Sequence, residues 1–378
     1  MNQPAPRLHP DAAASPASAA SPRADAKPIF RVEDLAVSFN NGKGPRIRAV
    51  DGVRMSIFPN QTLAVVGESG CGKSVTAMSS LQLVPSPPGR VDRGEILYTT
   101  SKELGWGEVD LTALDEHKIR QIRGNEIAMI FQEPMSSLNP VYNIGDQITE
   151  AILLHQRVNK KQARDIAIAA MTDVGIPDPE RRLAAYPHEF SGGMRQRVMI
   201  AMALSCQPRL LLADEPTTAL DVTIQKQILD LLADLKRTRD MAIMLITHDL
   251  GVVAENADVV CVMYAGRVVE YAPVFELFDH PLHPYTRGLL ASIPKIHERR
   301  ERLITIQEVV SDEAQFRRLE GEGIRPWWPW HNPPEGVHSG PIDSTLRRVR
   351  PDHWVAVWAT PSALAEPSPE PELTFRRG

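Results

Sequence analysis

The stretch TLAVVGESGCGKS (residues 62–74) decides how the rest of the chain is interpreted. It begins with a short apolar run ending in glycine, which is typical of a buried strand. The glycines that follow let backbone N–H groups turn inward around a phosphate, and the helix expected from Ser74 onward adds the partial positive charge of its N-terminus. The pattern GxxxxGK[ST] therefore predicts a nucleotide site, in which Lys73 reaches the β- and γ-phosphates and the Ser74 hydroxyl binds Mg²⁺.

The eight residues of this loop and the one that follows are expected to surround the phosphates. They are Gly67, Glu68, Ser69, Gly70, Cys71, Gly72, Lys73, Ser74 and Val75. Cys71 occupies a position where the loop needs only a backbone N–H, so its side chain is expected to be incidental. The alternative is a reactive thiolate, because helix N-termini lower the pKa of cysteine.

Composition and charge exclude several classes of protein. The 378 residues are 43% hydrophobic, which is ample for a globular core, and the formal net charge is −5. A negative charge argues against nucleic acid as a partner, because neutralising phosphates needs a basic surface. No apolar run approaches the roughly 18 residues of a membrane-spanning helix, and the N-terminus has no signal-peptide pattern. We therefore expect a chain made and kept in the cytosol.

Several further apolar runs resemble the first. RLLLADE (209–215) and AIMLITHD (242–249) are predicted to be buried strands, and DVVCVMYAGRVVEY (258–271) is predicted to be a hairpin that turns at Ala265 and Gly266. The three cysteines are far apart and match no metal or disulfide spacing. Free cytosolic thiols are the expected state.

Helical patterns lie between these strands. Apolar stripes predict one helix over residues 163–174, with Asn159 as its cap and Gly175 as its stop, and another over 224–235. Strands alternating with helices predict an α/β fold, in which a mostly parallel sheet is covered on both faces. After Pro273 the chain is expected to be irregular.

Two acidic residues follow the strand 209–213 directly. Asp214 ends the strand, where a carboxylate can hold Mg²⁺ through water. Glu215 comes next and can polarise an attacking water as a general base.

FSGGM (190–194) predicts a second anion site. Ser191 is expected to cap a helix, and Gly192 and Gly193 expose backbone N–H groups at its N-terminus. This site lies 118 residues after Lys73 and begins a helix of its own. Two phosphate-facing sites in one chain suggest that two chains enclose each nucleotide between them.

Together, these stretches resemble the ATPase subunits of ATP-binding-cassette (ABC) transporters, over about residues 29–294. GESGCGKS resembles the Walker A motif and LLLADE resembles Walker B. FSGGM resembles the signature motif, with Phe190 and Met194 where Leu and Gln are commoner. The resemblance implies ATP and Mg²⁺ as ligands. It also implies a P-loop NTPase (RecA-like) ABC ATPase core with an antiparallel β subdomain, an inserted helical subdomain and a C-terminal extension.

The resemblance assigns roles to further residues. Gln132 in IFQEP resembles the Q-loop glutamine, which senses Mg²⁺ and couples to the membrane subunits. Asp221 resembles the D-loop aspartate. His248, which follows Glu215 by 33 residues, resembles the switch histidine that contacts the γ-phosphate. Phe39 resembles the aromatic residue that stacks on adenine, and a plain core position on a strand is the alternative.

Narrower features resemble the oligopeptide, dipeptide and nickel importers. They are SLNP (137–140), YAPVFELFDHPLHPYTRGLLASIP (271–294) and RPDHWVAVWA (350–359). Many members of that group carry cysteines across the C-terminal extension, and in some these hold an iron–sulfur cluster. This chain has no cysteine after Cys261, so a cluster is not expected. The Trp-rich segment 325–334 is expected to serve apolar burial rather than partner binding.

The expected organisation follows from these assignments. Residues 1–28, rich in Ala, Pro and Ser, are expected to be a disordered tail. Residues 29–272 are expected to form the ABC ATPase domain, with a helical subdomain over about 135–204, and 273–378 the extension.

The partners implied are a second, related ATPase chain, two membrane permease subunits and an external solute-binding protein, with no nucleic acid. A heterodimer is favoured over a homodimer, at the cytoplasmic face of the inner membrane. Peptides are the favoured solute, and nickel, glutathione or another solute are the alternatives. The rival classes are a soluble ABC ATPase without a transport role and an exporter.

Overall fold

The computed structural model describes most of the chain. The described residues are 27–42, 44–132, 137–218, 220–293, 305–317, 325–331, 333, 337, 343–359, 371, 373 and 375. The expected disordered tail, residues 1–28, lies outside this part except for its last two residues.

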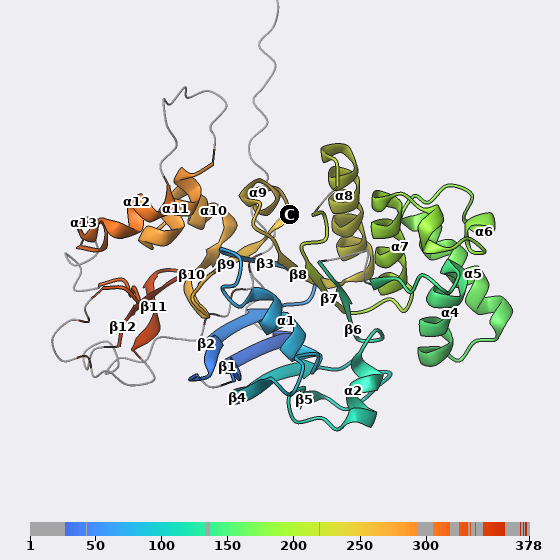
Figure 1. Cartoon of the computed structure of the whole chain (residues 1–378), viewed down its shortest axis with the longest axis horizontal. Helices are drawn as coiled ribbons and strands as arrows, with labels where there is room; N and C mark the ends of the chain where they lie inside the picture. The colour runs from blue at the N-terminus through green and yellow to red at the C-terminus, as the bar shows by residue number, and fades with distance from the viewer. Residues whose placement is uncertain are drawn as a thin grey trace, which may run out of the picture.

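Two sheets organise the described part of the molecule (Figure 1). The smaller is antiparallel and has the order β2 (Ile47–Ile57), β1 (Phe30–Phe39), β4 (Gly89–Thr99), β5 (Glu108–Asp110). The larger has the order β11 (Ser344–Arg350), β12 (His353–Trp358), β10 (Arg267–Pro273), β9 (Val259–Tyr264), β3 (Thr62–Val66), β8 (Ala242–Ile246), β7 (Leu210–Asp214), β6 (Ile127–Ile130). Strands β6, β7, β8, β3 and β9 are parallel, and β10 turns back antiparallel to β9.

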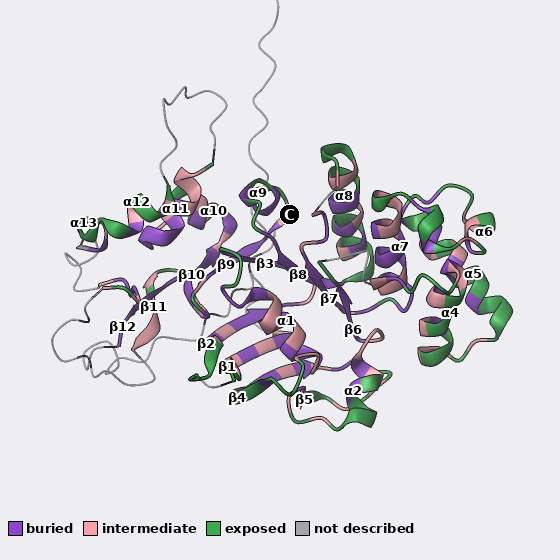
Figure 2. Ribbon diagram, in the orientation of Figure 1, coloured by how far each residue is buried: buried purple, intermediate pink, exposed green. Residues whose placement is uncertain are grey.

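The parallel strands confirm the expectation drawn from their apolar runs. Every residue of β3, β7 and β8 is buried, as Figure 2 shows for the centre of the large sheet. Strands buried on both faces lack the alternation of half-exposed strands, which explains their continuous apolar sequence. The hairpin β9–β10 turns at Ala265 and Gly266, both with positive φ, the conformation that matches the twist of a tight hairpin.

The helices divide into four groups. Next to the antiparallel sheet lie α1 (Lys73–Ser80) and α2 (Glu116–Ile122). Between β6 and β7 come α4 (Ile144–His155), α5 (Lys160–Asp173), α6 (Pro179–Arg182), the 3₁₀ turn η1 (Pro187–Glu189) and α7 (Gly192–Leu204), and we name this group the helical subdomain. Between and after the last parallel strands come α8 (Val222–Arg239) and α9 (Leu250–Asn256). The extension holds α10 (Val274–Asp279), α11 (Pro284–Ala291), α12 (Ile306–Ser311) and α13 (Glu313–Arg317). None of these described helices has the length and apolar character needed to cross a bilayer.

The cap and stop predicted for the helix over 163–174 are confirmed. Asn159 caps α5 in a reciprocal capping box with Gln162, and Gly175 follows the helix with positive φ. Asp221 caps α8 by accepting a hydrogen bond from the N–H of Ile224 at 3.0 Å. Helix α8 contains the predicted range 224–235 and extends beyond it to Val222 and Arg239.

The expectation of irregular chain after Pro273 was wrong. Four short helices and two strands follow it in the described part of the extension. These helices have only five to eight residues, too few for a clear helical period. Strand β12 pairs with β10 and so joins the extension to the large sheet. The division at residue 272 stays a prediction.

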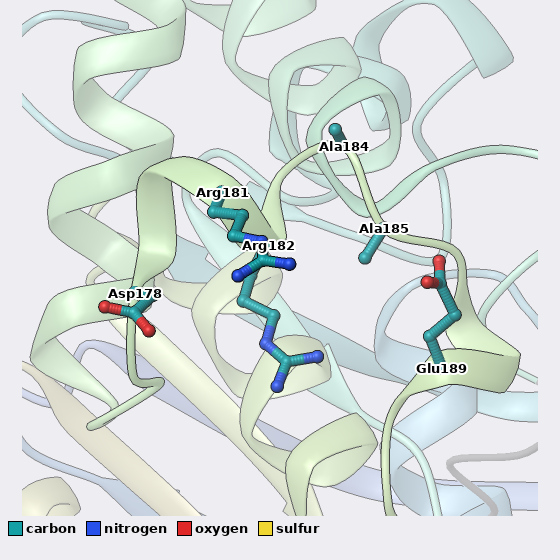
Figure 3. Close-up of a pocket in the computed structure, with 6 residues that line it drawn as sticks. All are labelled: Asp178, Arg181, Arg182, Ala184, Ala185 and Glu189. Carbon is teal, nitrogen blue, oxygen red and sulfur yellow. The ribbon is translucent and has the colours of Figure 1, made fainter.

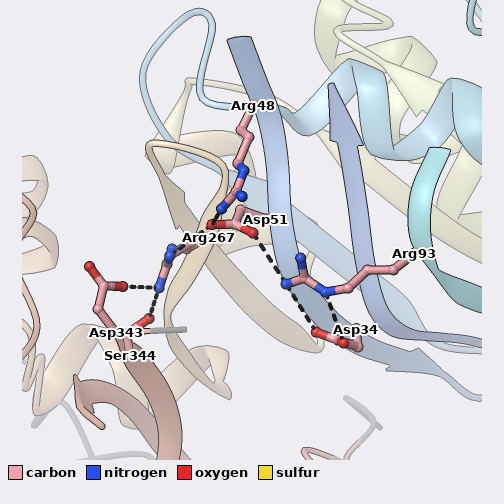
Figure 4. Close-up of polar contacts among 7 residues, drawn as sticks. All are labelled: Asp34, Arg48, Asp51, Arg93, Arg267, Asp343 and Ser344. Carbon is pink, nitrogen blue, oxygen red and sulfur yellow. Dashed lines mark hydrogen bonds and ion pairs between the residues drawn. The ribbon is translucent and has the colours of Figure 1, made fainter. Parts of the chain in front are cut away.

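An ion-pair network links the two sheets (Figure 4). Asp51 on β2 accepts from Arg267 on β10 at 2.7 Å and from Arg93 on β4 at 3.2 Å. Arg93 also pairs with Asp34 on β1 at 3.0 Å. Arg267 reaches on to Asp343, beside β11. The network therefore holds the antiparallel sheet, the large sheet and the extension in one arrangement.

Candidate functional site

The loop between β3 and α1 is shaped by two glycines that no other residue could replace. A Cβ at Gly67 would lie 2.2 Å from the carbonyl oxygen of Met263, and one at Gly72 would lie 2.4 Å from that of Ala49. Both glycines have positive φ, at +148° and +104°. At Gly70, also at positive φ, nothing described lies within 4 Å of the Cβ position. The loop is thus held tightly against the sheet on one side and open on the other, as a phosphate cradle requires.

Lys73 begins α1 and folds back over this loop. The residue is 6% exposed. Its ammonium group donates to the carbonyl oxygens of Gly67 at 2.8 Å and Glu68 at 2.9 Å. These acceptors are neutral, so a phosphate that enters the loop competes for the ammonium with a stronger, charge-assisted hydrogen bond.

The remaining loop residues differ in exposure. Glu68, Ser69 and Gly70 are exposed, whereas Cys71 is only 5% exposed and Val75 is half-buried against the core. Burial raises the pKa of the Cys71 thiol, although the neighbouring Lys73 opposes this shift. A raised pKa and a buried sulfur argue against the reactive thiolate that was the alternative.

Asp214 ends β7 beside the loop. It is 4% exposed. Burial raises its pKa, and so does the charge of Glu215, while a hydrogen bond with Ser74 and the charge of Lys73 oppose the shift. Its Oδ1 atom is buried without a hydrogen-bond partner among the described residues. A carboxylate oxygen left unpaired beside a serine hydroxyl fits the oxygen ligands that Mg²⁺ prefers.

Glu215 is the centre of a polar cluster at the carboxyl ends of the strands. Its Oε2 accepts from the Thr218 hydroxyl at 2.8 Å and from the Gln132 amide at 3.1 Å. Its Oε1 lies 3.2 Å from Nδ1 of His248. The structure therefore brings together Gln132, Glu215 and His248, which the sequence assigned to one site.

The conformation and charge of Glu215 are both unusual. Its φ is +47°, a strained backbone that costs about 1–3 kcal/mol and often marks functional sites. Burial raises its pKa, but hydrogen bonds from Thr218 and His248, with the charges of His248 and Lys73, lower the pKa below its usual value. The side chain is thus a carboxylate near neutral pH, held in place by these contacts.

Sequence reasoning missed two residues, one in this cluster and one beside it. Thr218 follows Glu215 by three residues, a spacing that lets a hydroxyl reach back to the carboxylate, and this could have been noticed. Gln196 on α7 is 1% exposed and donates to the carbonyl oxygen of Pro216. It links α7 to the segment after Glu215, and no local signal pointed to it.

The signature residues lie elsewhere. Ser191 caps α7 and accepts from the N–H of Met194 at 3.4 Å. Ser191 and Gly192 are exposed, and nothing described lies within 4 Å of the Cβ position of Gly192. Figure 1 shows α7 well apart from α1, with β7 between them. Asp221, also exposed, begins the neighbouring helix α8. These residues are not brought to the phosphate loop of their own chain.

Phe39 ends β1 on the other side of the loop. It is half-buried and packs against the core cluster of the antiparallel sheet. A Cβ at Gly89 on the next strand would lie 3.0 Å from Cε1 of its ring. Part of the ring is therefore committed to the core, and stacking on adenine stays a prediction.

The helical subdomain carries two hollows on its surface. A groove of about 800 Å³ runs between α4, α5 and the segment after α6, and its lining includes Leu153, Leu154 and Leu183. A smaller cleft of about 380 Å³ lies on the other side of that segment (Figure 3), where Arg181 and Arg182 lie between Asp178 and Glu189. Both hollows are lined by charged groups at their edges.

No group of three or more His, Cys, Asp or Glu side chains that could hold a metal occurs among the described residues. The three cysteines, Cys71, Cys206 and Cys261, are all buried and unpaired.

Two family models match the chain. A model described as "ABC transporter" matches residues 50–218, and one described as "Oligopeptide/dipeptide transporter, C-terminal region" matches 269–321. The first match spans the phosphate loop, Gln132 and Glu215. The second begins in β10 and spans α10 and α11.

Curated relatives cover most of the chain. The oligopeptide transport ATP-binding protein OppD of Bacillus subtilis (strain 168) is 52% identical over 277 residues, which are 73% of this chain and 75% of the relative. The dipeptide transport ATP-binding protein DppD of the same organism is 50% identical over 268 residues, 71% of this chain and 77% of the relative.

Solved structures share the fold. The ATP-binding cassette MJ0796, in a dimer bound to ADP and Pi, superposes with a TM-score of 0.57 at 23% identity, over 65% of this chain and 98% of that one. CbiO1 from Clostridium perfringens superposes with a TM-score of 0.54 at 26% identity, over 67% of this chain and 91% of that one. The expected P-loop ABC ATPase fold is confirmed. The chain belongs to the ABC transporter family of ATP-binding proteins, in the branch that carries the oligopeptide/dipeptide transporter C-terminal region.

Proposed function

We propose that this chain is the ATP-hydrolysing motor of an ABC importer and that the imported solute is a peptide. The observation that carries the hydrolytic role is the Glu215 carboxylate, which Gln132, Thr218 and His248 contact from three segments of the chain. It lies next to Asp214, whose buried oxygen has no partner among the described residues.

The residues present fit ATP with Mg²⁺. Backbone N–H groups of residues 69–74 and the Lys73 ammonium would bind the phosphates, and Ser74, Asp214 and Gln132 would hold the metal. When bound, Mg²⁺ neutralises charge on the β- and γ-phosphates. Glu215 accepts a hydrogen bond from the attacking water and orients it, which is worth roughly 10²–10⁴ in rate. His248, at the end of the next strand, would contact the γ-phosphate.

Dimerisation completes the site in this proposal. Ser191, Gly192, Gly193 and Met194 of one chain, with its Asp221, face the phosphates held by Lys73 of the other. Ser191, Gly192 and Asp221 are exposed, and helix α7 lies apart from α1 of its own chain, which supports this arrangement. A helix N-terminus with free N–H groups stabilises a phosphate. We propose a related second ATPase chain as the partner, and a homodimer is the alternative.

The groove on the helical subdomain is the proposed contact with the membrane permease subunits. Its lining includes Asn143, eleven residues after Gln132, and the exposed apolar side chains of Leu153 and Leu154, which are 39% and 61% exposed. An apolar surface with a polar rim is typical of a protein-binding site. Movement of Gln132 with the nucleotide would then reach the permease at the cytoplasmic face of the membrane.

The peptide assignment rests on the printed names of the relatives and on the matching C-terminal region. The solute itself would be selected by an external binding protein and the permease. Nickel, glutathione and other small solutes are the alternatives.

Uptake measurements test the proposal. Cells with the native chain are compared with cells carrying Lys73→Ala, using a labelled dipeptide and a labelled pentapeptide. Loss of uptake with a stable mutant chain is the expected result. Unchanged uptake of both, with the mutant chain stable and bound to the permease, would rule out peptides. ATP hydrolysis by the native complex would still support the motor role.

A further inference from the structure

The C-terminal extension contacts the phosphate loop through one hydrogen bond. The backbone N–H of Glu68 donates to the phenolic oxygen of Tyr285 at 3.0 Å, across 217 residues of sequence. Tyr285 lies in α11 and is fully buried. A hydroxyl of the extension therefore binds the first N–H of the loop after Gly67.

The position of Tyr285 is set by its neighbours. Its own N–H donates to Nδ1 of His283 at 3.1 Å, where His283 caps α11. The backbone N–H of His283 donates to the carboxylate of Glu270 on β10 at 3.0 Å. The ring Nε2 of His283 lies 2.9 Å from the carbonyl oxygen of Trp327. All four residues are buried, so the start of α11 is attached to the large sheet by bonds that water does not weaken.

An aromatic cluster supports the ring of Tyr285. The ring of Tyr264, at the end of β9, lies 4.7 Å from it. Trp328 stacks on Tyr264 at 4.3 Å, and the indole N–H of Trp330 donates to the Tyr264 hydroxyl at 3.2 Å. The Trp-rich segment thus packs behind the tyrosine that touches the loop, and such aromatic pairs restrict one another in orientation.

Lys73 and Tyr285 both form hydrogen bonds with the backbone of Glu68. The Glu68 carbonyl accepts from Lys73 at 2.9 Å, and the Glu68 N–H donates to Tyr285. If Lys73 turns toward a phosphate, the carbonyl loses this donor. The bond to Tyr285 remains, because it comes from the buried extension and not from the loop.

We infer that Tyr285 is a positioning residue for ATP, whose hydroxyl keeps the first turn of the phosphate loop in its binding conformation. This inference rests on the proposed ATP site. Preorganising a loop raises affinity by reducing the ordering that binding requires. Tyr285 then affects ATP affinity, while the hydrolytic step depends on Glu215.

The test is the substitution Tyr285→Phe in the whole chain. This change removes the phenolic oxygen and keeps the ring. Equilibrium binding of ATP and the steady-state kinetics of hydrolysis are measured. We expect the affinity for ATP to fall roughly 2- to 10-fold, the worth of one hydrogen bond. The KM for ATP rises by a similar factor, and kcat stays within about twofold.

Tyr271→Phe is the matched control. Tyr271 on β10 is also fully buried, and its hydroxyl donates to a backbone oxygen, that of Ser56, at 3.0 Å. Its hydroxyl partner Ser56 and its ring neighbour Trp354 both lie outside the phosphate loop. Loss of the Tyr271 hydroxyl should lower the stability of the protein about as much as loss of the Tyr285 hydroxyl, and it should leave ATP affinity unchanged. Equal loss of affinity in both variants, or unchanged affinity in Tyr285→Phe, would overturn the inference.

A second measurement uses the native chain and tests the hydrogen bond between Glu68 and Tyr285 even if Tyr285→Phe does not fold. Hydrogen exchange of the Glu68 amide in the native chain should be slowed, with and without ATP. Exchange at the rate of a free amide would contradict the inference. A native chain that binds ATP no better than Lys73→Ala would instead refute the ATP site itself.

Discussion

The side-chain amide of Gln132 donates a hydrogen bond to the carboxylate of Glu215 at 3.1 Å, although 83 residues separate them. Gln132 follows the edge strand β6, and Glu215 follows its neighbour β7. The bond joins the segment that leads into the helical subdomain to the residue proposed to orient water. Any movement of that segment therefore changes the surroundings of Glu215.

Removal of this bond is expected to slow hydrolysis more than it weakens nucleotide binding. In Gln132→Ala, Glu215 loses one of its three side-chain partners, and kcat for ATP should fall roughly 3- to 10-fold, as for the loss of one hydrogen bond. Steady-state kinetics and equilibrium ATP binding check this. Gln156→Ala is the control, because that amide bonds to Ser205 in the helical subdomain. A fall of equal size in the control would contradict the prediction.

Glu215→Gln should stop hydrolysis while ATP remains bound. The amide keeps the shape of the side chain but is a poor base, so we expect kcat to fall by about 10²–10⁴. Trapping of bound, unhydrolysed ATP measures the outcome. The exposed Glu103→Gln, in the antiparallel subdomain, is the charge-matched control. Retention of native kcat in Glu215→Gln would exclude this residue as the base.

The lowered pKa of Glu215 predicts a pH profile. Burial alone would raise this pKa, but Thr218 and His248 bring it below its usual value of 4.5. The ionised form is stabilised by folding, so this stabilisation is present above pH 4.5 and is lost only as the pH falls through the lower pKa. Activity that needs the carboxylate should accordingly persist into mildly acidic solution.

Thr218→Val tests the cause of this shift. Loss of the hydroxyl removes a bond to the ionised form, so the acid limb of kcat should move to higher pH. The control is Thr238→Val, whose hydroxyl bonds a backbone oxygen within α8. An unchanged acid limb in Thr218→Val would show that Glu215 does not determine it.

Asp51 is predicted to be a major contributor to stability. It is 8% exposed and accepts from both Arg267 and Arg93. In Asp51→Asn the positive charge of Arg267, whose side chain is 14% exposed, loses one of its negative partners. We expect the free energy of unfolding to fall by about 2–4 kcal/mol, somewhat less than for a fully buried pair. Chemical denaturation measures it. Asp92→Asn is the control, because its partner Arg90 is 65% exposed and such pairs contribute about 0–1 kcal/mol. Equal losses would refute the prediction.

The local elements of the site could be predicted from the sequence. The caps Asn159 and Ser191 depend on interactions within a few residues, and the glycine-rich loop and the continuous apolar strands can be recognised from residue type alone. The positions of Lys73 and Asp214 followed from the same short motifs. For this reason the fold class and most of the proposed site residues were accessible without a structure.

The tertiary structure decided which of these residues meet. The order of strands in the large sheet places β6, β7 and β8 side by side, and only this order brings Gln132 and His248 to Glu215. The same holds for Tyr285 and Glu68, which no motif connects. Such contacts depend on sheet order and on packing between distant segments, and neither leaves a local pattern in the sequence. The short helices after Pro273 form for the same reason, because burial against the sheet stabilises them where their own propensity does not.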